Sequence, residues 1–160
     1  MWRRPAIDGK ASFSIRNATE ADQPVITAII HEAHLNPRNL DWPRFIVAET
    51  GGQVIGVGQV KPHDDGSREL ASIAVNPDFQ GQGVGTAICQ ALIERENGIL
   101  FLMTRAELEP YYARFGFGKV NSSEVTPYFR RILRLTGVFK GLMRRVMGTY
   151  LIVMKRPPGG

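Results

Sequence analysis

The sequence contains a single cysteine, Cys89, and no continuous apolar stretch as long as a membrane span. One cysteine excludes a disulfide bond within the chain, and a spanning helix would need about 20 consecutive apolar residues. No apolar segment typical of a secretory signal follows Met1–Pro5. These absences predict a cytoplasmic protein without a membrane span. Cys89 lies beside Ile88 in a segment with helical periodicity, so we expect a small buried side chain rather than a nucleophile.

Patterns of metal ligands are also missing. The histidines His31, His34 and His63 are not spaced with cysteines or carboxylates as metal ligands would be. We therefore predict no metal site and interpret all three histidines as surface groups. The length of 160 residues, with 43% hydrophobic and 22% charged residues, is typical of one soluble globular domain.

Acidic residues are absent from the end of the chain. Residues 125–160 contain eight Lys and Arg side chains and no Asp or Glu, whereas residues 1–124 contain 12 basic and 15 acidic side chains. The formal net charge of +5 therefore comes from the C-terminal segment alone. A local excess of positive charge raises the local concentration of anions and calls for a local explanation.

A glycine-rich loop is the most informative segment that is present. Residues 75–86 read Val-Asn-Pro-Asp-Phe-Gln-Gly-Gln-Gly-Val-Gly-Thr, between a hydrophobic segment and an apolar segment with helical periodicity. Glycine allows close approach of the backbone to a ligand and dihedral angles that other residues avoid. The free N–H groups and positive dipole of a helix N-terminus attract anions. This loop therefore predicts a phosphate or pyrophosphate site.

Two common phosphate motifs do not fit this loop. A P-loop requires a lysine after its second glycine, and no lysine lies between Lys61 and Lys119. The dinucleotide fingerprint Gly-x-Gly-x-x-Gly, read from Gly81, meets Thr86 at its last position. The pattern Gln-x-x-Gly-x-Gly, from Gln80 to Gly85, fits at every position. In this pattern the chain resembles the GNAT superfamily of N-acetyltransferases, whose corresponding loop binds the pyrophosphate of acetyl-CoA.

A second segment strengthens the resemblance. Residues 111–117 read Tyr-Tyr-Ala-Arg-Phe-Gly-Phe, similar to a Tyr-x-x-x-Gly-Phe segment that many GNAT proteins carry at this distance from the loop. Tyr112 falls on the position of the family's usual general acid, and a phenol is a plausible proton donor to a thiolate. Tyr111 is the alternative, because the doubled tyrosine permits a register error of one residue. The resemblance covers roughly residues 12–120 and a final strand, 149–155.

The hydrophobic pattern along the chain agrees with this family. The pattern gives the order of strands and helices, and the resemblance implies an α/β (α+β) GNAT-like fold, with a mixed, mostly antiparallel twisted sheet, flanking helices and a helical insertion before the last strand. We expect a single N-acetyltransferase domain over 1–160, with a loose N-terminal arm over 1–11 and a basic helical insertion over 121–148. The expected strands are 12–17, 44–49, 53–60, 69–75, 99–103, 117–120 and 149–155, and the expected helices are 19–34, 84–98 and 106–115.

The resemblance also implies the site residues. Glu69, at the start of a strand, is the candidate general base, whose structural alternative is a solvated strand-end carboxylate. In the family this strand and a neighbouring one splay apart and admit the pantetheine arm, so Ile73, Ala74 and Val75 would bind it through their main chain. The pyrophosphate would bind at the loop residues Gln80, Gly81, Gln82, Gly83, Val84, Gly85 and Thr86. Arg105 departs from the family pattern, because many members carry Asn seven residues before the tyrosine.

The basic segment has two interpretations. Apolar side chains recur at helical spacing over 129–146, and Gly137 and Gly141 suggest two short helices rather than one. The face without apolar residues carries Arg130, Arg131, Arg134, Lys140, Arg144 and Arg145. These cations are either simply solvated or form a lid that favours an acceptor with a carboxylate or phosphate group.

The function predicted is transfer of an acetyl group from acetyl-CoA to a primary amine of a small-molecule or peptide acceptor, by direct attack in a ternary complex. A degenerate acyl-CoA-binding sensor or interaction module is the alternative. A nucleic-acid or membrane-surface adaptor would explain the basic segment but neither motif, so we expect no nucleic-acid partner. A homodimer is compatible with the sequence, and the identity of the acceptor is beyond it.

Overall fold

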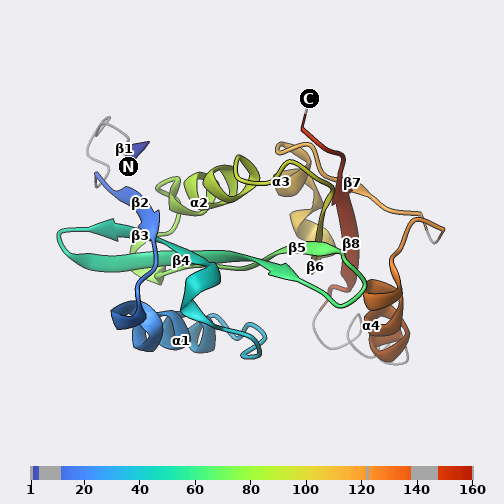
Figure 1. Ribbon diagram of the computed structural model, residues 1–160, viewed down its shortest axis with the longest axis horizontal. Helices are drawn as coiled ribbons and strands as arrows, with labels where there is room; N and C mark the ends of the chain where they lie inside the picture. The colour runs from blue at the N-terminus through green and yellow to red at the C-terminus, as the bar shows by residue number, and fades with distance from the viewer. Residues whose placement is uncertain (1, 4–11, 122, 138–147, 160) are drawn as a thin grey trace. The chain divides into compact units, whose positions relative to one another are not determined.

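The computed structural model describes residues 2–3, 12–121, 123–137 and 148–159, and the chain divides into two compact units (Figure 1). Unit 1 comprises Met1–Val60 and Leu70–Arg95, and unit 2 comprises Lys61–Glu69 and Glu96–Gly160. Two consecutive strands, β4 and β5, each cross the boundary between the units. Each unit is described by itself below.

The described residues of unit 1 form five strands and two α-helices. The strands are hydrogen-bonded in the order β1-β2-β3-β4-β5, with antiparallel pairing from β1 through β4. They are β1 (Trp2–Arg3), β2 (Ser14–Asn17), β3 (Phe45–Thr50), β4 (Gln53–Pro62) and β5 (Arg68–Val75). The helices are α1 (Gln23–Glu32) and α2 (Val84–Ile93), with the short 3-10 helices η1 (Glu20–Asp22), η2 (Trp42–Arg44) and η3 (Pro77–Phe79).

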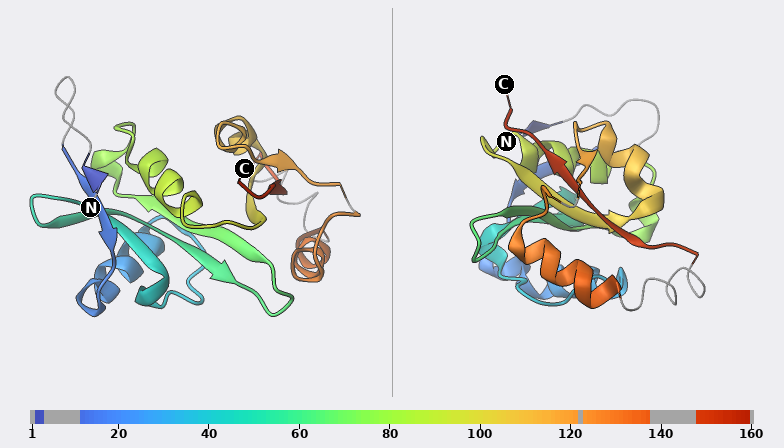
Figure 2. Two further views of the ribbon diagram at one scale, coloured as in Figure 1. Left: turned by 45° about the horizontal axis from the view of Figure 1, so that its top comes forward. Right: turned by 90° about the vertical axis from the view of Figure 1, so that its right-hand side faces the viewer.

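The two α-helices of unit 1 cover opposite faces of its strands (Figures 1 and 2). Helix α1 contributes Ile26, Ile29 and Ile30 to a buried cluster with Phe45 and Val47 of β3. These apolar positions recur at three- and four-residue spacing on the helix, so one stripe of α1 packs against the strands. Helix α2 packs against the other face at two glycines of β4, which are described below.

The described residues of unit 2 form a second group of strands with helices on both sides (Figure 2). The strand order is β6-β8-β7, and the start of β5 pairs in parallel with β6 at Glu69 opposite Phe101. The elements are β6 (Leu100–Arg105), η4 (Ala106–Leu108), α3 (Glu109–Ala113), β7 (Gly118–Lys119), α4 (Pro127–Gly137) and β8 (Leu151–Arg156). Helix α4 places Phe129 in a buried cluster with Phe101 of β6 and Val153 of β8.

The mixed, mostly antiparallel arrangement with flanking helices confirms the predicted fold class. Several element boundaries differ from the predicted ones because of local chemistry. Pro24 and Pro110 lie at the first turns of α1 and α3, so a 3-10 turn precedes each α-helix. Helix α2 ends at Ile93 rather than at the predicted Gly98, because the apolar periodicity stops there.

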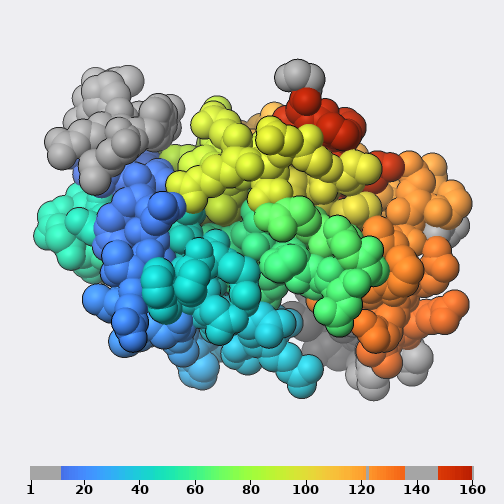
Figure 3. Space-filling model, in the orientation of Figure 1, coloured from blue at the N-terminus to red at the C-terminus, as the bar shows by residue number. Residues whose placement is uncertain are grey.

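Two predicted segments lie partly outside the described residues. Trp2 and Arg3 pair with β2 as a short strand, which differs from the loose arm predicted for 1–11, and residues 4–11 are not described. Helix α4 confirms a helix in the first half of the predicted insertion, and it contributes to the surface shown in Figure 3. The second predicted helix falls mainly on residues 138–147, outside the described residues. None of the described helices is both long and apolar enough to cross a membrane.

Candidate active site

The glycine-rich loop of unit 1 is held by its own polar side chains. The Asn76 side chain accepts a hydrogen bond from the Asp78 N–H at 3.0 Å, and this bond caps η3. The Gln80 amide donates to the Val75 carbonyl at 3.1 Å, and the Gln82 amide donates to the Asp78 carbonyl at 3.3 Å. The two glutamines therefore fix the loop between β5 and α2 rather than extending freely into solvent.

Two glycines of this loop adopt backbone conformations that side chains disfavour. Gly81 has φ of 74° and Gly83 has φ of 85°, both in the left-handed region. Gly83 is the N-cap of α2 and provides no side-chain hydrogen bond to the first turn. The first-turn N–H groups of an α-helix have no partner within the helix, so this end of α2 is suited to an anion.

Helix α2 lies unusually close to β4 because two residues of β4 lack side chains. A Cβ atom at Gly58 would lie 2.5 Å from Ile88 Cγ2 and 2.7 Å from Ile73 Cδ1. A Cβ atom at Gly56 would lie 2.9 Å from Ile88 Cδ1 and 3.0 Å from Val84 Cγ1. The sequence analysis did not identify these two glycines as site residues, although they determine where the N-terminus of α2 stands. The sequence did offer one sign of this role, because the two glycines alternate with valine in a predicted strand, and glycine inside a strand often marks a close approach of another element.

Strand β5 contains a local irregularity immediately before the predicted pantetheine-binding residues. Ser72 has φ of 57°, a left-handed conformation that is costly for a residue with a side chain. The predicted positions Ile73, Ala74 and Val75 follow it, with Ala74 buried and the other two half-buried. A left-handed residue interrupts the regular alternation of a strand and redirects its backbone groups.

Gln59 of β4 holds this irregular backbone. Its side chain is fully buried, and its amide donates to Ser72 Oγ at 2.9 Å and to the Asn39 carbonyl at 3.1 Å. Asn39 is also left-handed, with φ of 56°, so one buried amide contacts two strained positions. Sequence reasoning missed Gln59, because a single polar residue in an apolar strand does not reveal its partners.

Glu69 is a buried side chain of unit 2, with 7% of the residue exposed, so it is not a solvated strand-end carboxylate. Its Oε2 lies 2.7 Å from Nε2 of His63. The His63 side chain is 8% exposed and stacks on the Tyr128 ring, with 3.5 Å between ring centroids. The sequence interpretation of His63 as a surface group is therefore wrong. His31 and His34 are exposed, as expected.

Both candidate tyrosines are half-buried in α3. The Tyr112 ring packs edge-on against Phe117, with centroids 6.3 Å apart, and the Phe117 N–H donates to the Tyr112 carbonyl at 3.4 Å. The Tyr111 ring packs against Phe115, and the Arg114 guanidinium lies 4.9 Å from its centroid. Gly116, with φ of 86°, forms the turn that brings Phe117 back to Tyr112. The assignment of the acid to Tyr112 stays a prediction.

The remaining candidates contribute little chemistry. Cys89 is fully buried, which confirms its prediction as a small core side chain. Arg105 is exposed and lies 3.3 Å from Glu107. Among the described residues, no three His, Cys, Asp or Glu side chains are grouped so that they could hold a metal ion.

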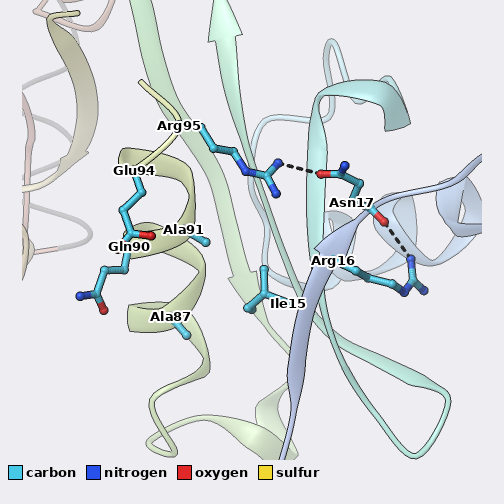
Figure 4. Close-up of a pocket in the computed structure, with 8 residues that line it drawn as sticks. All are labelled: Ile15, Arg16, Asn17, Ala87, Gln90, Ala91, Glu94 and Arg95. Atoms are coloured by element: carbon cyan, nitrogen blue, oxygen red, sulfur yellow. Dashed lines mark hydrogen bonds between the residues drawn. The ribbon is translucent and has the colours of Figure 1, made fainter. Parts of the chain in front are cut away.

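Unit 1 also contains a hollow of about 520 Å³ between β2 and α2 (Figure 4). Its arginines are engaged within the unit, because Arg95 donates to Asn17 at 2.8 Å and Arg16 pairs with Asp22 at 2.7 Å. None of the predicted site residues lines this hollow. We therefore do not identify it with the acetyl-CoA site.

Comparison with protein families confirms the resemblance that the loop and the tyrosine segment indicated. The family model described as an acetyltransferase (GNAT) domain matches residues 41–119, which contain both motifs. The chain therefore carries a GNAT acetyltransferase domain over residues 41–119. The assignment of the glycine loop, Glu69 and Tyr112 to an active site stays a prediction.

Similar proteins include the N-alpha-acetyltransferase RimI of Mycobacterium tuberculosis (strain ATCC 25618 / H37Rv), which is 26% identical and aligned over 79% of this GNAT chain and 78% of its own length. The ribosomal-protein-S18-alanine N-acetyltransferase of Escherichia coli shares the fold, with a TM-score of 0.63 and 22% identity over 92% of this chain and 95% of that one.

N-acetylglutamate synthase of Neisseria gonorrhoeae, solved with coenzyme A and N-acetylglutamate, gives a TM-score of 0.73 with 21% identity over 94% of this chain. The GNAT chain spans only 36% of the length of that synthase chain.

Proposed function

We propose that this GNAT protein transfers the acetyl group of acetyl-CoA to a primary amine of an acceptor, by direct attack of the amine within a ternary complex. The observation that carries this proposal is the loop Gln80–Thr86, whose left-handed glycines lead into the uncapped N-terminus of α2. The GNAT acetyltransferase domain and the solved neighbours with coenzyme A support acetyl-CoA as the donor. We also propose that residues 1–160 form a single N-acetyltransferase domain.

The loop would hold the donor through its backbone. The amides of Gln80, Gly81, Gln82, Gly83, Val84, Gly85 and Thr86 are the proposed ligands of the pyrophosphate. Backbone amides at a helix N-terminus combine hydrogen bonds with the favourable end of the helix dipole. A side chain at Gly83 would have to adopt a φ of 85°, which residues with a Cβ rarely do. The close packing of α2 on Gly56 and Gly58 fixes these amides in place.

The backbone of β5 would polarise the thioester. We assign the pantetheine arm and a carbonyl-polarising N–H to the main chain of Ile73, Ala74 and Val75. The strained Ser72, held by Gln59, supports this assignment. In a regular strand the backbone N–H and C=O groups are used in pairing with neighbouring strands, whereas a fixed irregularity can leave such groups available to a ligand. A preorganised N–H stabilises the negative charge that develops on the carbonyl oxygen during attack.

Proton transfers complete the proposed reaction. The acceptor must lose a proton to become a nucleophilic amine, and Glu69 is the group assigned to receive it, directly or through water. The neutral amine nitrogen then forms a bond to the thioester carbon and loses its second proton to water. The carbon–sulfur bond breaks, and the sulfur leaves with the bonding electrons. Tyr112 is assigned to protonate that thiolate. No covalent enzyme intermediate is required, which agrees with the burial of Cys89.

The basic face of α4 supports an anionic acceptor as the finer form of the proposal. A hollow of about 410 Å³ is lined by Pro127, Arg130, Arg131, Arg134 and Leu135. Arg130 donates to the Val125 carbonyl at 3.0 Å, and no described acidic side chain forms an ion pair with these three arginines. Guanidinium groups bind carboxylate and phosphate in a bidentate manner.

Charge reversal would test this preference. We expect replacement of Arg130, Arg131 and Arg134 by glutamate to raise the acceptor KM, by an amount that shrinks as salt is added, because the surface charges are screened. The KM for acetyl-CoA should stay unchanged as an internal control. An acceptor KM that is indifferent to both charge reversal and ionic strength would show that these arginines are simply solvated.

Thiol release from acetyl-CoA across a panel of primary amines, including amino acids and peptide N-termini, tests the main proposal. Calorimetry on Gly83→Val should show that acetyl-CoA affinity is largely lost while the protein remains folded. Gly98→Val is the matched control, since Gly98 has open space around it and lies outside the loop. Unchanged affinity in Gly83→Val would refute the loop assignment. Binding of acetyl-CoA without turnover of any amine would favour a cofactor sensor instead.

A further inference from the structure

A buried histidine of unit 2 contacts the carboxylate that the proposed mechanism uses as its base. His63 Nε2 lies 2.7 Å from Glu69 Oε2, and the two side chains are only 8% and 10% exposed. An ionised carboxylate can only accept hydrogen bonds, so a base at Glu69 would accept this bond from Nε2–H of His63. Because both side chains are buried, water competes little for the same oxygen, and the hydrogen bond between His63 and Glu69 is stronger than it would be in water.

The imidazole ring also contacts two neighbouring aromatic side chains of α4. It stacks on Tyr128, with 15° between the ring planes, and meets Phe129 edge-on with centroids 5.8 Å apart. Phe129 is fully buried and packs against Phe101 of β6, the residue opposite Glu69 in the sheet. The ring that holds Glu69 and the strand that flanks Glu69 are therefore parts of one packed cluster.

The loop that carries His63 is tied to the start of α4. Asp65 accepts a hydrogen bond from the Tyr128 N–H at 2.8 Å, and it also accepts from the N–H and the hydroxyl of Ser67. Burial acts to raise the pKa of the Asp65 carboxyl, but the hydrogen bonds from Ser67 and Tyr128 outweigh it and hold this pKa well below its usual range. Asp65 therefore stays ionised at neutral pH, and it keeps Tyr128 against His63.

We propose that His63 is a positioning residue for Glu69, a role that rests on the proposed acetyltransferase function. The Nε2–H bond selects one rotamer of the Glu69 side chain and directs its other oxygen toward the acceptor amine or its bridging water. Catalysis by a positioned group depends steeply on geometry, and a displacement of about 1 Å can lower the rate by about 100-fold. His63 acts through Glu69 and needs no contact with the substrate.

Two substitutions separate the hydrogen bond from the ring packing. His63→Phe retains a flat ring against Tyr128 but removes the donor, whereas His63→Gln retains a donor. We expect His63→Phe to lower kcat by roughly 10- to 100-fold, with the KM for acetyl-CoA nearly unchanged, and His63→Gln to recover part of the loss. His31→Gln, at an exposed position of α1, is the control and should behave as wild type.

A double-mutant cycle tests whether His63 acts through Glu69. In a Glu69→Gln background, the further substitution His63→Phe should leave kcat almost unchanged, because no carboxylate remains to be positioned. If the two losses multiply instead, His63 acts independently and the proposal is overturned. Full activity of His63→Phe would overturn it too. Absence of thiol release from the wild-type protein with every amine tested would overturn the proposed function itself, which is a distinguishable result.

A spectroscopic measurement checks the contact without relying on turnover. Proton–nitrogen correlation spectra of the wild-type imidazoles should show His63 protonated at Nε2, and Glu69→Gln should shift both ring nitrogens of His63. Glu94→Gln, at an exposed carboxylate of unit 1, is the matched control and should leave them in place. Ring nitrogens of His63 that do not respond to Glu69→Gln would refute the contact on which the proposal depends, even if a His63 variant fails to fold.

Discussion

Replacement of Gly58 by alanine should both destabilise the protein and weaken its binding of acetyl-CoA. The added Cβ would lie 2.5 Å from Ile88 Cγ2, far inside van der Waals contact. That methyl group is bonded directly to Cβ of a β-branched residue in α2, and such residues have one strongly preferred χ1 rotamer in a helix. The methyl group therefore cannot rotate away, and the helix itself must move from β4.

The expected magnitude follows from two opposing effects. Overpacking a well-packed core costs about 1–3 kcal/mol, whereas replacing glycine by alanine gains about 0.4–1 kcal/mol through the unfolded chain. The net loss should be about 1–2 kcal/mol, which lowers the Tm of a protein of this size by about 2–8 °C. Movement of α2 also displaces the amides proposed to bind the pyrophosphate, and a loss of about 1.4 kcal/mol there weakens binding tenfold.

Thermal denaturation and calorimetry with acetyl-CoA would measure both effects. Gly98→Ala is the control, because a Cβ at Gly98 meets nothing within 4 Å. Gly56→Ala should be milder than Gly58→Ala, because its closest contact is Cδ1 of Ile88, at 2.9 Å, and the end of a side chain can move. If Gly58→Ala is as stable as Gly98→Ala and binds acetyl-CoA equally well, the close packing of α2 does not position the loop and the reasoning fails.

Two further predictions follow from the tyrosines and from a buried ion pair. Tyr112→Phe should keep its affinity for acetyl-CoA and lose turnover by roughly 10²–10⁴-fold, the usual contribution of general acid catalysis to the rate. If Tyr112→Phe is fully active and Tyr111→Phe is inactive, the general acid is Tyr111 instead. Hydrogen bonds from Arg16 lower the pKa of Asp22 from 3.8 to about 2, against the opposing effect of burial. Because the folded-state pKa is depressed, this carboxylate stabilises the fold above its unfolded pKa by about 2 kcal/mol, and the stabilisation is lost as pH falls from about 5 to about 2. Urea denaturation across this range should show the stability of wild type approaching that of Asp22→Asn, and a constant difference would contradict the pairing.

The sequence by itself determined the features that depend on local backbone chemistry. The order Gln80-x-x-Gly83-x-Gly85 after an apolar segment specified a loop that only glycine can form, and Gly83 indeed lies at the N-cap of α2 with a left-handed φ. The apolar stripe of α1 was predictable for a similar reason, because burial of one helix face imposes a period along the chain. These properties require only knowledge of near neighbours in sequence.

The tertiary structure alone decided which polar groups meet. His63 and Glu69 are separated by a turn, and Asp65 reaches the N–H of Tyr128, 63 residues away. Gln59 of β4 contacts Ser72 of the neighbouring strand β5. Hydrophobic periodicity encodes which face of an element is buried, but the partner of a buried polar atom depends on strand register and helix placement, which are set by the packing of the whole core. For that reason the glycine loop could be identified from the sequence, whereas the environment of the candidate base could not.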